Sequence, residues 1–290
     1  MRYHVTHNTE YDYRLPVVSS QLVLRLKPRD LPRRQTLLDH TIRLSVKGTE
    51  ILEQLDYFGN VLHEVRLHTR HDALSINATF DVEVTPRDEI LLDLSPAWET
   101  AAKTLRDPQT QEQWHAAQFC FPSPHVNVAA ALELAKQLAV PGTPTLRLAL
   151  QLTEFIYREF TYKGGVTDVH TDVKDVIRRR VGVCQDFAHT LIALMRSLGL
   201  AIRYVSGYIL SQLDGRPALV GAEATHAWVS VYCPEFGWVD FDPTNNQITS
   251  GQHIVLGWGR DYADVAPTRG YILGGGQQKL EVDVRVRKAS

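Results

Sequence analysis

A helical apolar stripe that opens with a cysteine constrains this chain more than any other feature. Residues 178–200 read RRRVGVCQDFAHTLIALMRSLGL. From Phe187 onward, apolar side chains recur at i, i+4, i+7, i+8 and i+11, which is the spacing of one helix face, and Gly199 is a typical stop signal. The pattern predicts a helix packed against a core, with Cys184 at its N-terminus.

The predicted position of Cys184 favours a nucleophile. The first backbone N–H groups of a helix lack partners, and the positive end of the helix dipole stabilises an anion, so a thiol there ionises more readily than a free cysteine. Nucleophilic cysteines are commonly activated in this way. The alternative is a small buried hydrophobe, which is the ordinary role of a cysteine. The choice depends on whether the chain offers partners for a nucleophile.

Length and composition describe an ordinary globular protein. The 290 residues are enough for two domains that each bury a core, and 44% are hydrophobic and 22% charged. The net charge of -2 gives no general electrostatic case for binding nucleic acid or an anionic membrane. We therefore expect neither partner.

The N-terminus lacks the apolar core of a signal peptide, and no run of about 18 apolar residues indicates a membrane span. We expect a cytoplasmic protein. The three cysteines, Cys120, Cys184 and Cys233, are widely spaced and contain no Cys-x-x-Cys pair, so neither a disulfide framework nor a zinc finger is indicated. We expect free thiols and no cofactor.

The order of the periodic segments predicts two domains. Residues 1–96 alternate apolar and polar positions in five or more short runs separated by turn residues, which predicts an N-terminal β-sandwich-like or barrel-like domain. Residues 97–124 form a bridging segment. In residues 125–290 helices come first and strands follow, an order that indicates an α+β domain with a mostly antiparallel sheet. The expected helices are 127–138, 143–160 and 172–180.

The motif DYFGN at residues 56–60 is typical of a hairpin tip. Its two aromatic side chains, Tyr57 and Phe58, are interpreted as local packing, with a contact surface as the alternative.

Two later strands supply a candidate base and a candidate carboxylate. The runs 224–232 (ATHAWVSVY) and 238–244 (WVDFDPT) predict an antiparallel hairpin in which residue 232 pairs with residue 238. In this register His226 and Asp242 share one face as diagonal neighbours, roughly 7 to 8 Å apart at the backbone and within reach of a hydrogen bond. Asp240 shares the face but lies one step further from His226.

Cys184, His226 and Asp242 thus have the chemistry of a triad, because a thiolate needs a base and the base needs a group that orients it. The alternatives are structural roles. His226 could be a partly buried histidine that is hydrogen-bonded to a neighbouring acid, and Asp242 could be a turn residue before Pro243. The same three side-chain types are also metal ligands, but the helix-start position of the cysteine favours a nucleophile. We predict no metal site.

Three motifs in this order resemble the bacterial transglutaminase-like superfamily. They are GVCQDFAH at 182–189, THAWV at 225–229 and GWVDFDPT at 237–244. The opening residues 3–16 resemble the N-terminal β-region that accompanies this core in bacteria, and residues 264–270 resemble the stretch that ends it. The resemblance therefore covers nearly the whole chain.

The resemblance implies a papain-like, transglutaminase-like α+β core in which helices pack on an antiparallel sheet. It also implies that Cys184 attacks an amide carbonyl, that His226 exchanges the protons and that Asp242 orients the imidazole. The function expected from it is a thiol hydrolase, an amidase or peptidase, that cleaves a peptide or isopeptide bond in a peptide or protein substrate. The alternatives are a protein-glutamine acyltransferase that forms amide cross-links and a non-catalytic binding scaffold. No calcium-loop pattern appears in the sequence, so we carry over no calcium requirement.

Further residues are candidates for the surroundings of the reaction. The backbone N–H of Cys184 is expected to donate to the oxyanion, and Tyr162 and Gln185 are candidates for a second donor. Trp228 is a candidate wall that excludes water, and Asp240 is a further cleft candidate; packing is the alternative for Tyr162 and Trp228. His189 lies about 140° around the helix from Cys184 and is not expected to be the base.

Overall fold

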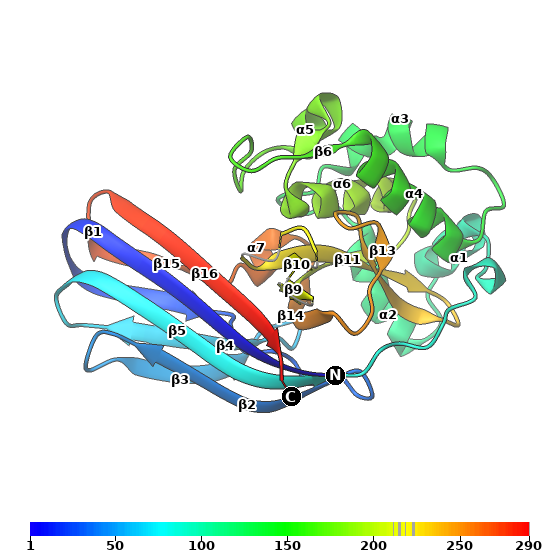
Figure 1. Cartoon of the computed structure of the whole chain (residues 1–290). Helices are drawn as coiled ribbons and strands as arrows, with labels where there is room; N and C mark the ends of the chain where they lie inside the picture. The colour runs from blue at the N-terminus through cyan, green and yellow to red at the C-terminus, as the bar shows by residue number, and fades with distance from the viewer. Residues whose placement is uncertain (211, 214–215, 218, 222–223, 290) are drawn as a thin grey trace.

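A curled β-domain packs against an α+β core in the computed structural model of this protein (Figure 1). The structure describes residues 1–210, 212–213, 216–217, 219–221 and 224–289. Within these residues no helix is both long enough and apolar enough to cross a membrane. The α+β class predicted from the sequence is confirmed.

The β-domain is built around one long strand, β1 (Arg2–Leu24). Its ladder with β5 is interrupted between Asp12 and Val17, where Pro16 has no N–H to donate, and the sheet curls. The first half of β1 pairs with β5 and β16, and the second half pairs with β4 and β15. The strands of this sheet other than β1 are β2 (Gln35–Leu44), β3 (Glu50–Leu55), β4 (Val61–Leu67), β5 (His71–Val84), β15 (Thr268–Gly274) and β16 (Gln278–Lys288).

The last two strands belong to this sheet, which corrects the predicted organisation. The sequence assigned residues 125–290 to the second domain, whereas β15 and β16 both pair with β1. The alternation in β16 buries Val284 and Val286 in a cluster with Tyr3 and Val5. Alternation predicts that a segment is a strand, but it does not specify the partner strand.

Helices form one layer of the core. The predicted bridging segment is largely helical, and the capping hydroxyl of Thr110, which accepts from the N–H of Gln113 at 3.2 Å, starts its second helix. The three helices expected after it are present within two residues of their predicted ends. The helices are α1 (Trp98–Arg106), α2 (Gln111–Ala117), α3 (Val128–Leu138), α4 (Thr145–Glu159), α5 (Val173–Arg179), α6 (Cys184–Ser197) and α7 (Tyr262–Val265), with short 3-10 turns η1 (Leu92–Leu94) and η2 (Gln118–Cys120).

The helix α6 lies in the middle of the core and is buried from Asp186 to Arg196. It packs on one face of a five-stranded antiparallel sheet through Ala227, Val229 and Val231 of the central strand. The strand order is β13 (Gln247–Ile248), β12 (Gly237–Asp242), β11 (His226–Cys233), β8 (Ile202–Ile209) and β14 (His253–Gly259). Short strands β6 (Thr161–Tyr162) and β7 (Val181–Gly182) pair with each other, as do β9 (Gln212–Leu213) and β10 (Arg216–Pro217).

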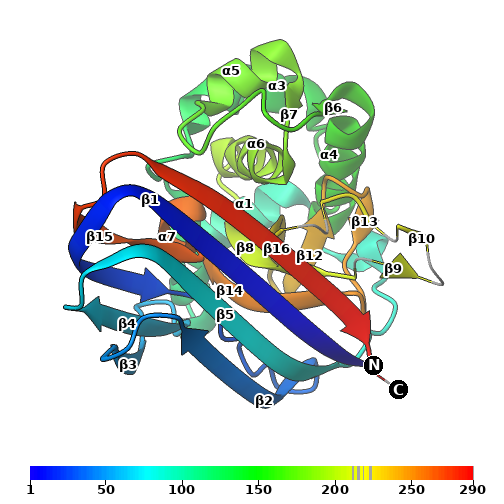
Figure 2. The same ribbon diagram turned by 60° about the vertical axis from the view of Figure 1, so that its left-hand side comes forward.

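The other face of the core sheet meets the β-domain (Figure 2). Phe80 and Tyr3 of the β-domain share a buried cluster with Tyr208 and Ile254 of the core. The side chain of Gln35 also bridges the two regions, because it donates to the carbonyl of Val255 and accepts from its N–H, both at 2.8 Å. The β-domain therefore supports the sheet that carries the candidate base.

Candidate active site

The local sequence fixes Cys184 at the first position of α6. The carboxylate of Asp186 accepts from the backbone N–H of Val183 at 2.8 Å and from the hydroxyl of Thr167 at 2.7 Å. This closes the helix start, as an N-terminal cap does. A Cβ at residue 182 would lie 2.6 Å from the same carboxylate, so only glycine fits there. Cys184 itself remains partly exposed.

His226 and Asp242 lie where the predicted hairpin register puts them. Tyr232 pairs with Trp238, as expected, and this aligns β11 and β12. Nε2 of His226 donates to Oδ2 of Asp242 at 2.9 Å, and both side chains are fully buried. The other ring nitrogen, Nδ1, is not bound to Asp242 and is left for proton exchange with the neighbouring thiol of Cys184, which interacts with the imidazole.

The electrostatics of the pair favour an imidazolium. Burial lowers the pKa of His226, but the charge and hydrogen bond of Asp242, helped by the adjacent Cys184, raise it to about 10. Burial also raises the pKa of Asp242, yet the interactions with His226 and His253 outweigh it and hold that pKa well below its ordinary range. Asp242 is therefore an ionised carboxylate at neutral pH.

Two residues that the sequence did not indicate complete the surroundings of Asp242. Nε2 of His253 donates to Oδ2 at 3.1 Å, and Nδ2 of Asn245 donates to the same oxygen at 2.8 Å. The backbone N–H groups of Thr244 and Asn245 donate to Oδ1 at 2.9 and 3.2 Å. Asn245 directly follows the DPT motif, which was a usable signal, whereas His253 comes from another strand and has no local signature.

Tyr162 reaches the site because β6 pairs in parallel with β7, which puts it opposite Gly182. A Cβ on Gly221 would lie 3.0 Å from Nδ1 of His226 and 3.4 Å from the hydroxyl of Tyr162. The backbone at Gly221 therefore lies against both groups. Val220 beside it is held by Asn245, which accepts from its N–H at 2.9 Å. The structure thus brings Tyr162 to the candidate base.

Gln185 and Trp228, the other two neighbours proposed from the sequence, differ in position. Gln185 donates from Nε2 to the carbonyl of Val169 at 3.4 Å, so its amide is engaged away from the thiol. Trp228 is fully buried, and its ring lies 6.2 Å from the imidazole of His226 and 5.1 Å from that of His253. It forms the inner wall behind the candidate base.

Comparison with known proteins assigns the family. Residues 132–243 match the profile of the transglutaminase-like superfamily, and residues 3–83 match the bacterial transglutaminase-like N-terminal region. An uncharacterized protein of Mycobacterium tuberculosis (strain H37Rv) is 36% identical over 98% of this chain and 91% of its own length. This chain belongs to the transglutaminase-like superfamily.

Two further similarities concern the fold and one stretch of the sequence. The transglutaminase-like chain matches the crystal structure of a candidate cysteine protease from Cytophaga hutchinsonii with a TM-score of 0.75 and 21% identity, over 100% of this chain and 92% of that one. A protein-glutamine gamma-glutamyltransferase of Pseudomonas aeruginosa is 30% identical over 56% of this chain and 25% of its own length.

In this transglutaminase-like protein Asp240 is not brought to His226. Oδ2 of Asp240 lies 3.3 Å from Nη2 of Arg34, a β-domain residue. Because strand neighbours on one face are about 7 Å apart, a step of two residues is enough to separate the two aspartates. Asp240 thus joins the β-domain to the sheet through Arg34, and its role as a cleft residue stays a prediction.

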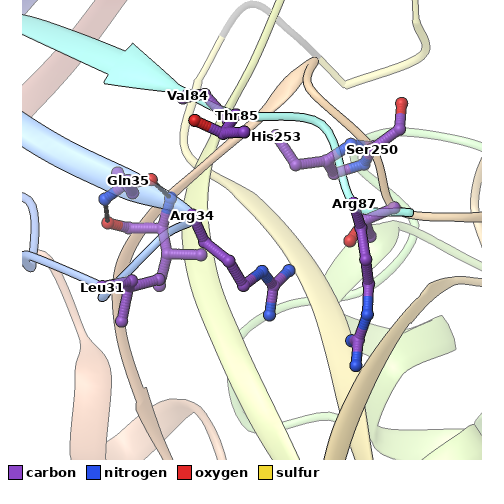
Figure 3. A pocket seen from close by; sticks show the side chains of 10 residues that line it. Leu31, Arg34, Gln35, Val84, Thr85, Arg87, Ser250 and His253 are labelled. Carbon is purple, nitrogen blue, oxygen red and sulfur yellow. Dashed lines mark hydrogen bonds between the residues drawn. The ribbon is translucent and has the colours of Figure 1, made fainter.

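A small pocket lies between the β-domain and the core (Figure 3). Arg34 and Arg87 line it from the N-terminal region, and His253 lines it from the core side. Arg87 donates to the carbonyl of Trp238 at 2.7 Å. His253, which donates to Asp242, therefore shares this pocket with residues of the β-domain.

His189, the other histidine of α6, is buried and has a structural contact. Its Nε2 accepts from the backbone N–H of Tyr262 at 3.2 Å, and its ring lies parallel to that of His125 at 5.6 Å. Burial lowers the pKa of His189 to about 3, so it stays neutral. Within the described residues no group of three histidine, cysteine or acidic side chains is arranged to hold a metal ion.

Proposed function

We propose that this protein is a thiol hydrolase that cleaves a peptide or isopeptide amide bond through a thioester on Cys184. The observation that carries the proposal is the position of a partly exposed cysteine at the start of α6, beside an imidazole that donates to Asp242 at 2.9 Å. A buried imidazole held by a carboxylate is the arrangement that cysteine nucleophiles use for proton exchange.

In the proposed first half-reaction Sγ of Cys184 attacks the amide carbonyl carbon, and its proton resides on Nδ1 of His226. The tetrahedral oxyanion accepts from the backbone N–H of Cys184, with the hydroxyl of Tyr162 as the candidate second donor. As the C–N bond breaks, His226 gives its proton to the leaving amine. Asp242 stabilises the imidazolium throughout, consistent with a His226 pKa near 10.

In the second half-reaction water attacks the thioester carbonyl and passes a proton to His226. The C–S bond then breaks, and the thiolate of Cys184 is restored beside the imidazolium. The partial exposure of residue Cys184 supports water as the acceptor, because solvent reaches this position of the chain. The proposed substrate is a peptide or a protein.

Transamidation is the second candidate function, and the similarity to a protein-glutamine gamma-glutamyltransferase favours it. In that reaction an amine takes the place of water and forms a new amide. The two reactions use the same triad and differ in what reaches the thioester.

One incubation separates the two. The full chain is mixed with a peptide library that contains glutamine side chains and lysine isopeptide bonds, together with a biotin-labelled primary amine, and the products are identified by mass spectrometry. A hydrolase splits the peptide at the cleaved amide into two fragments whose masses sum to that of the substrate plus one water, and neither fragment carries biotin. If biotin is found on glutamine side chains, the enzyme transfers the acyl group to an amine, and transamidation replaces hydrolysis as the proposed function. Cys184→Ser is the control, and neither product is expected from it. Absence of any product from the wild-type chain would favour the binding scaffold.

A further inference from the structure

The hairpin tip at residues 56–60 is rigidly fixed to the core. Nδ2 of Asn60 donates to the carbonyl of Trp258 at 2.8 Å, and its Oδ1 accepts from the N–H of the same residue at 2.9 Å. Asn60 is buried, and a Cβ at Gly257 would lie 2.6 Å from its side-chain oxygen. Oδ1 of Asp56 accepts from two backbone N–H groups of the tip, those of Phe58 and Asn60, at 2.9 Å each.

The two aromatic residues of this rigid tip have opposite environments. Phe58 packs against Phe119 of the core with ring centroids 5.9 Å apart, which is the local packing predicted from the sequence. Tyr57 beside it is 83% exposed. Folding gains almost nothing from an aromatic ring that stays in water, whereas a rigid exposed tyrosine supplies contact area at low entropic cost.

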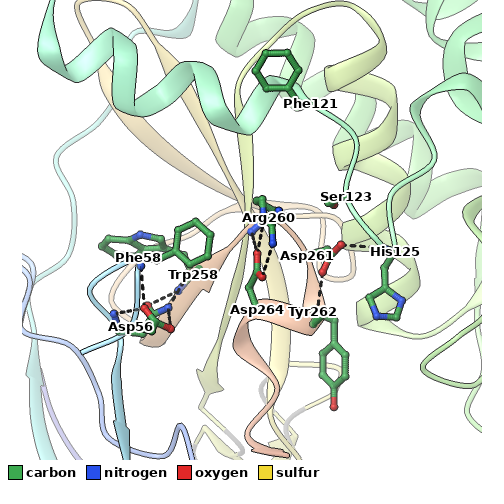
Figure 4. A network of polar contacts seen from close by, with 12 residues as sticks. Asp56, Phe58, Phe121, Ser123, His125, Trp258, Arg260, Asp261, Tyr262 and Asp264 are labelled. Atoms are coloured by element: carbon green, nitrogen blue, oxygen red, sulfur yellow. Dashed lines mark hydrogen bonds and ion pairs between the residues drawn. The ribbon is translucent and has the colours of Figure 1, made fainter. Parts of the chain in front are cut away.

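Tyr57 borders a cavity of about 620 Å³ between the β-domain and the core. A volume of this size is typical of sites for small molecules or short peptide segments. Phe121, which is 65% exposed, contributes a second aromatic surface from the core side. Figure 4 shows Phe58 and Asp56 to one side of the Arg260–Asp264 pair and Phe121 above the pair.

The charges in this cavity leave one cation unpaired. Nε of Arg25 lies 3.4 Å from the carboxylate of Asp56, and Arg260 makes two contacts of 2.9 Å with Asp264. Arg269 also lines the cavity and has no acidic partner in the part of the chain that the structure describes. An exposed guanidinium without a partner is complementary to a carboxylate.

The cavity shares the short helix α7 with the surroundings of the candidate nucleophile. Ala263 and Asp264 line the cavity, while the N–H of the preceding Tyr262 donates to His189 of α6. The lining residues Phe121 and Arg260 contact α6 through Arg196, whose guanidinium donates to their carbonyls at 3.0 and 2.7 Å. Arg196 is twelve residues, roughly 18 Å of helix rise, from Cys184, so a substrate chain docked in the cavity has to extend over about that distance to reach the thiol. Figure 4 shows Tyr262 and His125 on the opposite side of Asp264 from Phe58.

We propose that this cavity, bordered by Tyr57, Phe121 and Arg269, is a docking site for the substrate chain and takes a peptide segment in which an aromatic side chain is followed by a carboxylate. The aromatic ring packs between Tyr57 and Phe121, and the carboxylate pairs with Arg269. The inference rests on the proposed function, because it gives that function its substrate class.

Binding is tested with the full chain carrying Cys184→Ala, so that no turnover takes place. The probe is a fluorescein-labelled pentapeptide, Gly-Gly-Phe-Asp-Gly amide, and the readout is fluorescence anisotropy. Two comparison peptides replace Asp by Asn or Phe by Ala. We expect Tyr57→Ala and Arg269→Glu to weaken binding of the Phe-Asp peptide roughly tenfold each, the size of an interface hot spot. Tyr57→Phe and Arg269→Lys are expected to retain it.

Trp114→Ala is the matched control, because Trp114 is 64% exposed on α2 and does not line the cavity. Three outcomes would overturn the docking site. The three peptides could bind with equal affinity, or Tyr57→Ala and Arg269→Glu could leave the affinity for the Phe-Asp peptide unchanged. The third outcome is that the Phe-Asp peptide does not bind at millimolar concentration. Turnover of the peptide library by the wild-type chain reports separately on the proposed hydrolase. If the wild-type chain cleaves the library but the three peptides bind equally well, the docking site is wrong and the hydrolase proposal stands. If the peptides bind with different affinities but the wild-type chain cleaves nothing, the hydrolase proposal is wrong and the docking site stands.

Discussion

Asp242 is shared by two histidines: Nε2 of His253 lies 3.1 Å from the same carboxylate oxygen that binds His226 at 2.9 Å. The two imidazoles come from different strands, β14 and β11, and neither is exposed. His253 therefore acts on the candidate base only through the carboxylate. We interpret it as a positioning residue that keeps Asp242 ionised and correctly oriented.

Replacement of His253 by alanine is expected to lower kcat for peptide turnover by about tenfold, the equivalent of one hydrogen bond to a charged group. KM should stay nearly unchanged, because His253 is buried and lies behind the triad. His253→Gln keeps an amide donor and should recover most of the rate. A purely structural role would lower the melting temperature in both variants without separating their kcat values.

Alkylation by iodoacetamide at neutral pH is expected to select Cys184. Burial raises the pKa of Cys120 and of Cys233 to about 12, so both are almost entirely protonated at pH 7. Cys184 is partly exposed at a helix start beside His226 and should label at least about tenfold faster. Peptide mass spectrometry over a time course measures the three rates.

His226→Ala is the informative variant in this experiment, because it removes the partner imidazole and leaves the helix start intact. Labelling of Cys184 should slow, while the rates of Cys120 and Cys233 should not change. Equal rates at all three cysteines in the wild-type chain would count against an activated nucleophile.

The sequence predicts those parts of the site that local periodicity determines. The apolar stripe after Phe187 sets the start of α6, and the alternation on either side of residues 233–237 sets the register that aligns His226 with Asp242. Both follow from neighbours in the chain. His253 and Arg34 come from distant segments that tertiary packing brings to the sheet, and alternation within β16 could not show that its partner is β1.

Asp240 and Tyr57 show the same limit at single positions. Asp240 shares a strand face with Asp242, so the pattern alone gives it a similar environment, but Arg34 from the β-domain pairs with it. Tyr57 and Phe58 are adjacent aromatic residues in one turn, and only the position of the core separates a packed ring from an exposed one. Each outcome depends on a contact between the two regions.

Stability is expected to fall as the pH rises from neutral to about 10. The pKa of His226 is raised from 6.5 to about 10 in the folded chain, so the imidazolium stabilises the fold fully below pH 6.5. This contribution is lost as the pH rises through that window. Thermal unfolding followed by circular dichroism between pH 6.5 and 10 measures it. His226→Gln should show a shallower decline over the same range, and parallel curves would contradict the raised pKa.

Gly182→Ala is expected to destabilise the chain and disturb the nucleophile. The new Cβ would lie 2.6 Å from the carboxylate of Asp186 and 2.7 Å from its Cβ, so the cap over Val183 has to shift. We expect a loss of about 1–3 kcal/mol in the free energy of unfolding, the usual size for a forced contact in a packed region. Cys184 follows the cap directly, so its alkylation by iodoacetamide should slow as well.

Gly164→Ala is the matched control for this substitution, because a Cβ at residue 164 meets no atom within 4 Å. Urea unfolding measures the stability of both variants, and mass spectrometry measures the labelling rate of Cys184 in each. Asp186→Asn in the Gly182→Ala background separates the two causes. If the clash with the carboxylate group is the reason, the isosteric amide leaves the stability loss in place, whereas recovery in the double variant would point to the charge of Asp186 instead.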